Sequence, residues 1–113
     1  MYNSKILLSE WRTPTLKAIR SGVAVGLESI ASDERVVVLS GDLAESVKIQ
    51  DFAEKYPERF IEVGVAEQNM AGVAAGLSFT GLIPFMASYA TFSPGRNWEQ
   101  IRTTICYNDR KVI

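Results

Sequence analysis

Apolar residues along this chain follow two different rhythms, one helical and one typical of strands. Near the start they recur at spacings of three and four, which predicts one amphipathic helix carrying Leu16, Ile19, Val23, Leu27 and Ile30 on its apolar face. Thr13-Pro14 predicts the helix start, because a hydroxyl side chain caps a helix well and proline suits its first position. The helix is expected to end near Ser32-Asp33.

Short β-branched runs and further helical segments alternate after this point. Val36–Leu39 is a continuous apolar run, which suits a strand buried on both faces of a parallel sheet. Further strands are expected at 60–63 and 83–88, with the first residues of a fourth at 111–113. Helices are expected at 50–56, at 67–79 and from Ser93-Pro94 onward, the last with Trp98, Ile101 and Ile105 on its packed side.

Strands that alternate with helices predict the α/β class, with an open parallel sheet flanked by helices. Because the sequence stops as a strand begins, we expect an incomplete domain over residues 13–113, preceded by an N-terminal extension over residues 1–12.

Residues 68–95 carry no formal charge, a length that could suggest a membrane span. Polar residues interrupt the run, and Gly81 with Pro84 marks a turn inside it, so two elements buried in a protein core are favoured. Gly72 and Gly76 lie in the helical part of this run. Each weakens a helix by about 1 kcal/mol relative to alanine, which predicts that another backbone approaches closely there.

Charge and cysteine content exclude several classes of function. Twelve basic and thirteen acidic residues give a formal net charge of -1, so nucleic acid and anionic membranes are not expected partners. Cys106 is the only cysteine in the sequence, which forbids an intrachain disulfide and predicts a reducing, cytoplasmic location, with Cys106 as a small core residue. The sequence contains no histidine, so any imidazole chemistry would come from another chain.

Candidate chemistry gathers where the predicted strands end, since ligands of open parallel sheets bind outside the carboxyl ends of the strands. The loops there supply acidic and aromatic side chains suited to a flat heterocycle, namely Asp42, Glu67, Tyr89, Phe92, Arg96 and Trp98. Taken alone, a glutamate in the first turn of a helix more often only complements the helix dipole. Arg96 could equally be a surface charge or a contact to a substrate phosphate.

One segment resembles a known family. Gly-Val-Ala-Glu-Gln-Asn-Met at 64–70 is followed by Ala-Gly-Leu at 75–77, Gly-x-x-Pro at 81–84 and Tyr-Ala-Thr-Phe at 89–92. This series resembles the pyrimidine-binding domain of transketolases, above all the C-terminal section of split, two-subunit transketolases. Deoxyxylulose-phosphate synthases share a similar Ala-Glu-Gln run.

The resemblance implies thiamine diphosphate as the cofactor, with Glu67 as the residue that activates its aminopyrimidine. It further implies that Phe92 stacks on the pyrimidine, that Tyr89 and Trp98 line the pocket, and that Asp42 and Leu43 approach the thiazolium side. Arg96 would contact the substrate.

No metal ligand is expected in this chain. Gly41-Asp42, with Asn69 farther on, imitates a motif that holds magnesium and diphosphate, but Leu43 stands where the motif has glycine, so this loop cannot approach a phosphate closely. Magnesium and diphosphate would therefore be held by a partner domain or chain.

The resemblance implies half of a transketolase of the pentose phosphate pathway, which transfers a two-carbon ketol unit between sugar phosphates. A diphosphate-binding subunit would complete it, in a homodimer or heterotetramer. Two alternatives stay open: a deoxyxylulose-phosphate synthase-like fragment, and a non-catalytic fragment that only folds and dimerises.

Overall fold

A computed structural model describes residues 16–113, and the predicted extension at 1–12 and the predicted helix start at Thr13-Pro14 lie outside the described residues. The described chain forms three strands, β1 (Val36–Ser40), β2 (Phe60–Glu62) and β3 (Ile83–Ala87). The helices are α1 (Ser21–Ile30), α2 (Gln50–Lys55), a 3-10 turn at Pro57–Arg59, α3 (Glu67–Phe79), α4 (Trp98–Gln100) and a π-helix at Ile101–Cys106.

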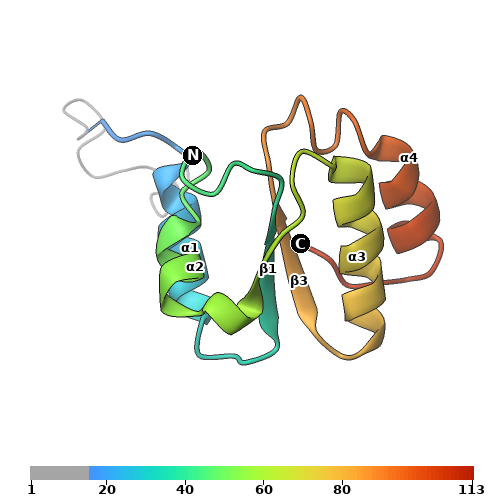
Figure 1. The fold of residues 1–113 in the computed structure, drawn as a ribbon, viewed down its shortest axis with the longest axis horizontal. Coiled ribbons are helices and arrows are strands. Elements are labelled where there is room, and N and C mark those ends of the chain that lie inside the picture. Colours follow the sequence, from blue (N-terminus) through green and yellow to red (C-terminus); the bar gives the residue numbers. More distant parts are fainter. Residues whose placement is uncertain (1–15) are drawn as a thin grey trace, which may run out of the picture.

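The three strands form one parallel sheet in the order β2-β1-β3, with helices on both faces. In Figure 1, α1 and α2 cover one face of the sheet, α3 covers the other, and α4 lies outside α3. The predicted α/β class and open parallel sheet are therefore confirmed. The strand assignments and α3 agree with the expectation to within one residue at each end.

The central strand β1 is buried along its whole length because its two faces pack into two separate hydrophobic cores. Successive side chains of a strand point to opposite faces. Val36 and Val38 accordingly pack with Leu27 and Phe52 of the α1–α2 layer. On the other face, Val37 and Leu39 of β1 pack with Met70 and Ala74 of α3.

The first helix is shorter than its apolar periodicity predicts. It begins at Ser21, and Leu16 and Ile19 are 89% and 97% exposed. The segment before it forms turns, in which Ser21 N–H donates to the Ala18 carbonyl oxygen. Only the later part of the stripe reaches the core, where Leu27 is buried, and the helix ends at Ile30 instead of Ser32-Asp33.

No backbone of the described part of this chain packs against the glycines of α3, so a close approach by the backbone of another chain stays a prediction. Ala71, Ala74 and Ala75 are the small residues that face the core. Gly72 and Gly76 are exposed, and within residues 16–113 no atom other than the helix's own backbone lies within 4 Å of the position that a Cβ would take on either.

The last helix also departs from the expectation. Ser93-Pro94 does not start it; the chain makes turns until Trp98, where α4 begins and runs on into the π-helix. The turns are tied back on themselves, with Gly95 N–H donating to the Ala90 carbonyl oxygen and Arg96 N–H to that of Phe92.

The end of the described chain lies beside β3. Residues 111–113 are not in a strand, but Ile113 N–H donates to Pro84 O, and Met86 N–H donates to Ile113 O. This is the hydrogen-bond pattern of a parallel pair. The predicted fourth strand is thus reduced, among the described residues, to a single pairing at the sheet edge.

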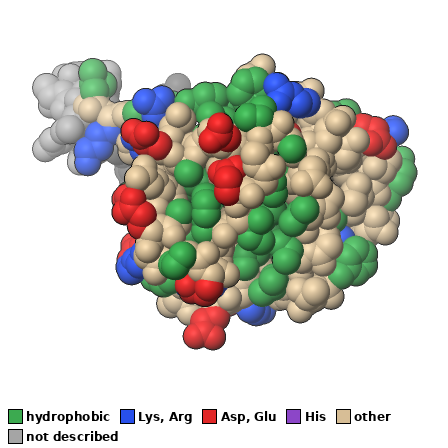
Figure 2. Space-filling model, viewed as in Figure 1, with side chains coloured by type: hydrophobic (Ala, Val, Ile, Leu, Met, Phe, Trp, Pro, Cys, Tyr) green, Lys and Arg blue, Asp and Glu red, His purple; other side chains and the backbone are tan. Residues whose placement is uncertain are grey.

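Charged side chains are mixed over the surface. Figure 2 shows Lys and Arg scattered on this face without one basic patch, and apolar side chains in a band near its middle. Within residues 16–113, every helix is too short or too polar to cross a bilayer.

Candidate functional site

The carboxyl ends of all three strands meet at one edge of the sheet. Ser40 at the end of β1 pairs with Glu62 of β2 and with Ala87 of β3, so the loops that follow these strands leave at one level. The loops that carry Asp42, Glu67, Tyr89, Phe92 and Arg96, at 41–47, 64–67 and 88–96, start from this edge. The loop placement inferred from the sequence is therefore correct.

Glu67 is placed by the turn between β2 and α3. Gly64 has a φ of 73°, a conformation that glycine adopts at little cost, and Ala66 N–H donates to its carbonyl oxygen. This turn aims the first residue of α3 inward, and Glu67 is 0% exposed. A carboxylate buried so fully costs free energy unless it is paired.

Arg96 supplies one partner for the buried carboxylate. Its Nη1 donates to Oε2 of Glu67 over 2.7 Å. The second oxygen, Oε1, has no hydrogen-bond partner within residues 16–113, although it is buried. Oε1 faces the end of β1, where a Cβ on Gly41 would lie 3.6 Å from it and 3.2 Å from the carbonyl oxygen of Gly64. Oε2 is thus paired with Arg96, while Oε1 can still accept a hydrogen bond from a ligand.

Asn97 fixes the turn that carries Arg96 against α3. Its side chain is buried, and Nδ2 donates to the main-chain carbonyl oxygen of Glu67 and to Oγ of Ser93. Gly95 permits the tight turn, because a Cβ there would lie 2.2 Å from the Thr91 carbonyl oxygen.

Two aromatic rings lie beside the arginine. The centroids of Tyr89 and Phe92 are 6.3 Å apart, and the Arg96 guanidinium carbon lies 4.7 Å from the Phe92 ring centroid. Arginine and an aromatic face at this distance attract each other. The structure therefore brings four predicted residues, Glu67, Tyr89, Phe92 and Arg96, into one neighbourhood.

Glu62, which the sequence reasoning treated only as a strand residue, connects two loops of this edge. Its Oε1 accepts hydrogen bonds from the backbone N–H groups of Asp42 at 2.7 Å and Gly64 at 2.8 Å. Asp42 sits in a left-handed conformation with φ 63°. Asp42 and Leu43, both predicted site residues, line a cavity of about 320 Å³ together with Glu62.

Trp98 and Cys106 are not packed as predicted. Trp98 is 66% exposed, and the Cys106 thiol is also exposed. Both line a small cavity of about 140 Å³ with Ile101 and Arg102, on the outer surface of the last helix. Ile105 is the residue of this helix that is buried against α3.

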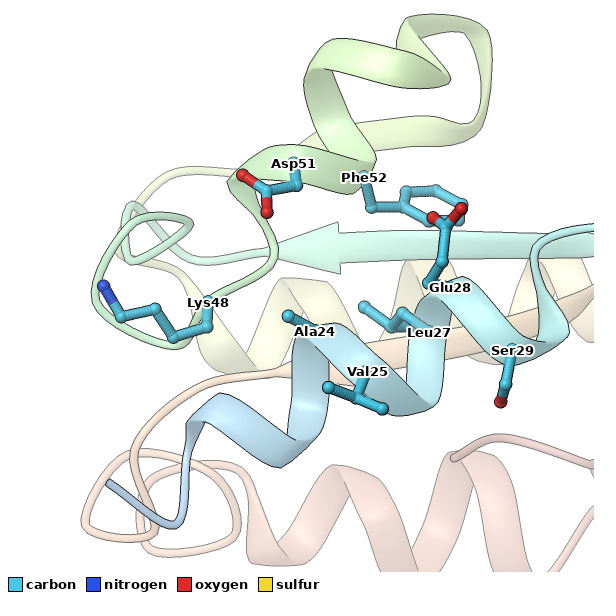
Figure 3. Close-up of a pocket in the computed structure, with 8 residues that line it drawn as sticks. All are labelled: Ala24, Val25, Leu27, Glu28, Ser29, Lys48, Asp51 and Phe52. Atoms are coloured by element: carbon cyan, nitrogen blue, oxygen red, sulfur yellow. The ribbon is translucent and has the colours of Figure 1, made fainter. Parts of the chain in front are cut away.

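A larger cavity, of about 520 Å³, lies on the other face of the sheet. Figure 3 shows it between α1 and α2, lined by Ala24, Val25, Leu27, Glu28, Ser29, Lys48, Asp51 and Phe52. None of the predicted site residues is among them, and α3 with Glu67 lies across the sheet. Size alone therefore does not select the candidate site; the buried carboxylate does.

Ligands for a metal ion do not cluster in the described residues. Between 16 and 113, no three Asp, Glu or Cys side chains gather closely enough to hold one.

The fold and this edge define a class of protein: an open parallel α/β domain that buries one carboxylate beside aromatic side chains where its strands end. The family model for the transketolase pyrimidine-binding domain matches residues 17–113. The chain belongs to that family.

Several relatives support this assignment. A putative transketolase C-terminal section of Methanocaldococcus jannaschii is 46% identical over 92 residues, which cover 80% of this chain and 29% of the relative. A 6-deoxy-6-sulfo-D-fructose transketolase subunit of a Clostridium species is 42% identical, covering 72% and 25%. A 1-deoxy-D-xylulose-5-phosphate synthase of Alkaliphilus oremlandii is 40% identical, covering 76% and 14%.

A solved structure agrees with these relatives. A split gene transketolase, described as an inactive beta4 tetramer, superposes with a TM-score of 0.67 at 46% identity, covering 82% of this chain and 30% of that one. The chain spans less than a third of the length of each of these proteins. Membership of the family implies use of thiamine diphosphate.

Proposed function

We propose that this chain supplies the pyrimidine-binding part of a split, thiamine-diphosphate-dependent transketolase, completed by a second chain or domain. Oε1 of Glu67 carries the proposal. It is a fully buried carboxylate oxygen that lacks a hydrogen-bond partner among the described residues. Such an atom is costly unless a ligand satisfies it.

The residues around Oε1 fit an aminopyrimidine. Glu67 would hold the ring at a ring nitrogen, because a carboxylate accepts a hydrogen bond there and stabilises positive charge on the ring. Phe92 would lie against the ring face, with Tyr89 beside it, since aromatic rings favour stacked or tilted contacts. When bound, thiamine diphosphate supplies the nucleophilic carbon and the electron sink for ketol cleavage.

The remaining predicted residues would act outside the aminopyrimidine pocket itself. Asp42 and Leu43 lie in the loop that follows β1 and line a cavity there. The thiazolium part of the cofactor is proposed to lie on this side. Trp98 would need the second chain to enclose it, because its ring is largely exposed. Arg96 as a substrate contact remains a prediction.

A second chain is part of the proposal, because the described residues offer neither a metal-ligand cluster nor a glycine after Asp42 to approach a phosphate. That chain would hold diphosphate and Mg²⁺. A homodimer or heterotetramer is the proposed assembly.

Reconstitution tests the function. The chain is mixed with a diphosphate-binding transketolase subunit, thiamine diphosphate and Mg²⁺, and ketol transfer from a ketose phosphate to an aldose phosphate is measured. Glu67→Gln should lower the rate by about 10² to 10⁴, the usual range for a positioned proton-transfer group. Glu99→Gln, at an exposed glutamate of α4, is the matched control and should leave the rate unchanged. Full activity in Glu67→Gln would contradict the role of this carboxylate.

Deoxyxylulose-phosphate synthesis is the second candidate, favoured by the 40% identity to such a synthase. The same mixture given pyruvate and glyceraldehyde 3-phosphate should then release carbon dioxide. If neither reaction occurs although the two chains assemble and bind cofactor, the result supports the hypothesis of a non-catalytic role in folding and association.

A further inference from the structure

Arg96 contacts two residues that the proposed function also assigns to the cofactor, Glu67 and Phe92, although it takes Oε2 of the carboxylate and leaves Oε1 for the ring. Its guanidinium is planar and lies 4.7 Å from the centroid of Phe92, and its Nη1 donates to the buried carboxylate of Glu67. A planar, nitrogen-bearing cation that stacks on an aromatic face and donates to a carboxylate has the recognition chemistry of a protonated aminopyrimidine.

The carboxylate needs such a partner when no ligand is bound. Glu67 is wholly buried, and Arg96 is the only basic side chain that pairs with it among residues 16–113. The Asn97 amide satisfies only the main-chain carbonyl of Glu67 and leaves the side-chain charge to Arg96. Removal of one member of a buried ion pair leaves an uncompensated charge, so the guanidinium is away from Glu67 in only a small fraction of the free molecules.

The two members of the pair differ in mobility. The Arg96 side chain is 44% exposed, while that of Glu67 is 0% exposed. Arg96 is anchored through its main chain, whose N–H donates to Phe92 O, and the neighbouring Asn97 is buried. The guanidinium can therefore swing into solvent while its backbone and the carboxylate stay in place.

We propose that in the free chain the Arg96 guanidinium fills the space between Phe92 and the Glu67 carboxylate, and that an aminopyrimidine bound at Oε1 and against Phe92 needs this space and displaces the guanidinium from Phe92 and from Oε2. This inference rests on the proposed function. Arg96 thereby sets cofactor affinity: the apparent dissociation constant equals the intrinsic one divided by the fraction of molecules in which the guanidinium has left. Until the cofactor binds, Arg96 keeps the buried Glu67 carboxylate paired.

The resting pair is tested first, without cofactor. Side-chain ¹⁵N NMR of the free chain should show a slowly exchanging guanidinium signal for Arg96, beside that of Arg59, whose guanidinium donates to the main-chain carbonyls of Ala31 and Asp33. The Arg96 signal should be lost in both Arg96→Gln and Glu67→Gln, while the Arg59 signal stays. Arg102→Gln, at an exposed arginine of the π-helix, should leave the Arg96 signal in place. An Arg96 signal that exchanges as fast as the exposed arginines would overturn the inference.

Displacement is tested by titration of thiamine diphosphate with Mg²⁺ into the chain assembled with its diphosphate-binding subunit. In the unsubstituted protein the protected Arg96 signal should disappear in proportion to bound cofactor. Arg96→Gln keeps a side-chain donor for Glu67 but loses the cation that lies over Phe92, and should bind the cofactor about threefold to tenfold more tightly. Arg96→Lys, which keeps the charge, should bind the cofactor with an affinity between those of the unsubstituted protein and Arg96→Gln.

Two failures can be told apart. If the cofactor binds while the Arg96 signal stays protected, or if Arg96→Gln binds more weakly, displacement is wrong and the proposed function stands. If the cofactor binds neither the unsubstituted assembly nor the Arg96 variants, the proposed function fails and the inference fails with it. The displacement signal comes from unsubstituted protein, so the test holds even if a variant folds poorly.

Discussion

The side-chain amide of Asn97 donates to the main-chain carbonyl oxygen of Glu67 over 3.1 Å, joining residues 30 positions apart. Asn97→Asp keeps the shape but replaces the donor with an acceptor that faces this carbonyl and Oγ of Ser93. We expect the free energy of unfolding to fall by about 1 to 3 kcal/mol, the cost of a buried polar group left unpaired. Urea denaturation measures this.

Asn108 offers the matched control for that substitution. Its Nδ2 also donates to two main-chain carbonyls, but the residue is exposed. Asn108→Asp should cost about 1 kcal/mol or less, because water replaces the lost hydrogen bonds. Equal losses for the two variants would mean that burial of Asn97 does not determine its contribution.

Gly41 leaves little room for a side chain. A Cβ there would lie 3.2 Å from the Gly64 carbonyl oxygen and 3.6 Å from Oε1 of Glu67. Gly41→Ala should reduce the free energy of unfolding by about 1 to 3 kcal/mol, as overpacking does, and should weaken cofactor binding. Gly26→Ala in α1 meets no atom within 4 Å among the described residues and should instead stabilise the chain by about 0.5 to 1 kcal/mol. Thermal melts of both variants show whether each substitution lowers or raises the melting temperature.

Glu62 should control the local stability of two loops. Its carboxylate accepts the backbone N–H groups of Asp42 and Gly64, and hydrogen bonds to a charged group contribute about 1.5 to 3 kcal/mol each. In Glu62→Ala these two amides should exchange with solvent roughly tenfold to a hundredfold faster, while amides in the middle of β1 stay unchanged. Amide hydrogen exchange followed by NMR tests this, and unchanged rates at both amides would contradict it.

Asp33 should titrate well below an ordinary aspartate. Hydrogen bonds from the side chain and backbone of Arg35 lower the pKa of Asp33 from 3.8 to about 2. Because the pKa in the folded state is lowered, the stabilisation by this carboxylate is complete above pH 3.8 and is lost as the pH falls through about 2. A carboxyl ¹³C NMR titration should give a midpoint near 2, and Arg35→Gln should move it toward 3.8.

Sequence patterns predicted the elements whose surroundings are simple. The apolar run at Val36–Leu39 is buried on both faces because α-helices cover both sides of β1, so its lack of alternation was informative. The span of α3 was also predictable, since a glycine turn precedes it and its small residues continue without a break. Periodicity alone could not show that Leu16 and Ile19 lie beyond the surface that α1 packs against.

The last helix was misread for a different physical reason. Its π-helical turn at Ile101–Cys106 changes the angular spacing of side chains, so a period of 3.6 residues puts Cys106 on the wrong face. The position of the Glu62 carboxylate could have been suspected, because Glu62 ends a strand at the ligand-binding edge. The pairing of Arg96 with Glu67 could not, since it depends on how two loops 29 residues apart turn in space.

The exposed thiol of Cys106 has a practical consequence. It is the only cysteine in the sequence and lines a small surface cavity with Trp98. One maleimide-linked probe can therefore be attached at a known position without any substitution. Since Trp98 begins the helix directly after the turn that carries Arg96, a fluorophore on Cys106 and the Trp98 indole form a donor–acceptor pair beside that turn once Trp11, the other tryptophan, is replaced by phenylalanine.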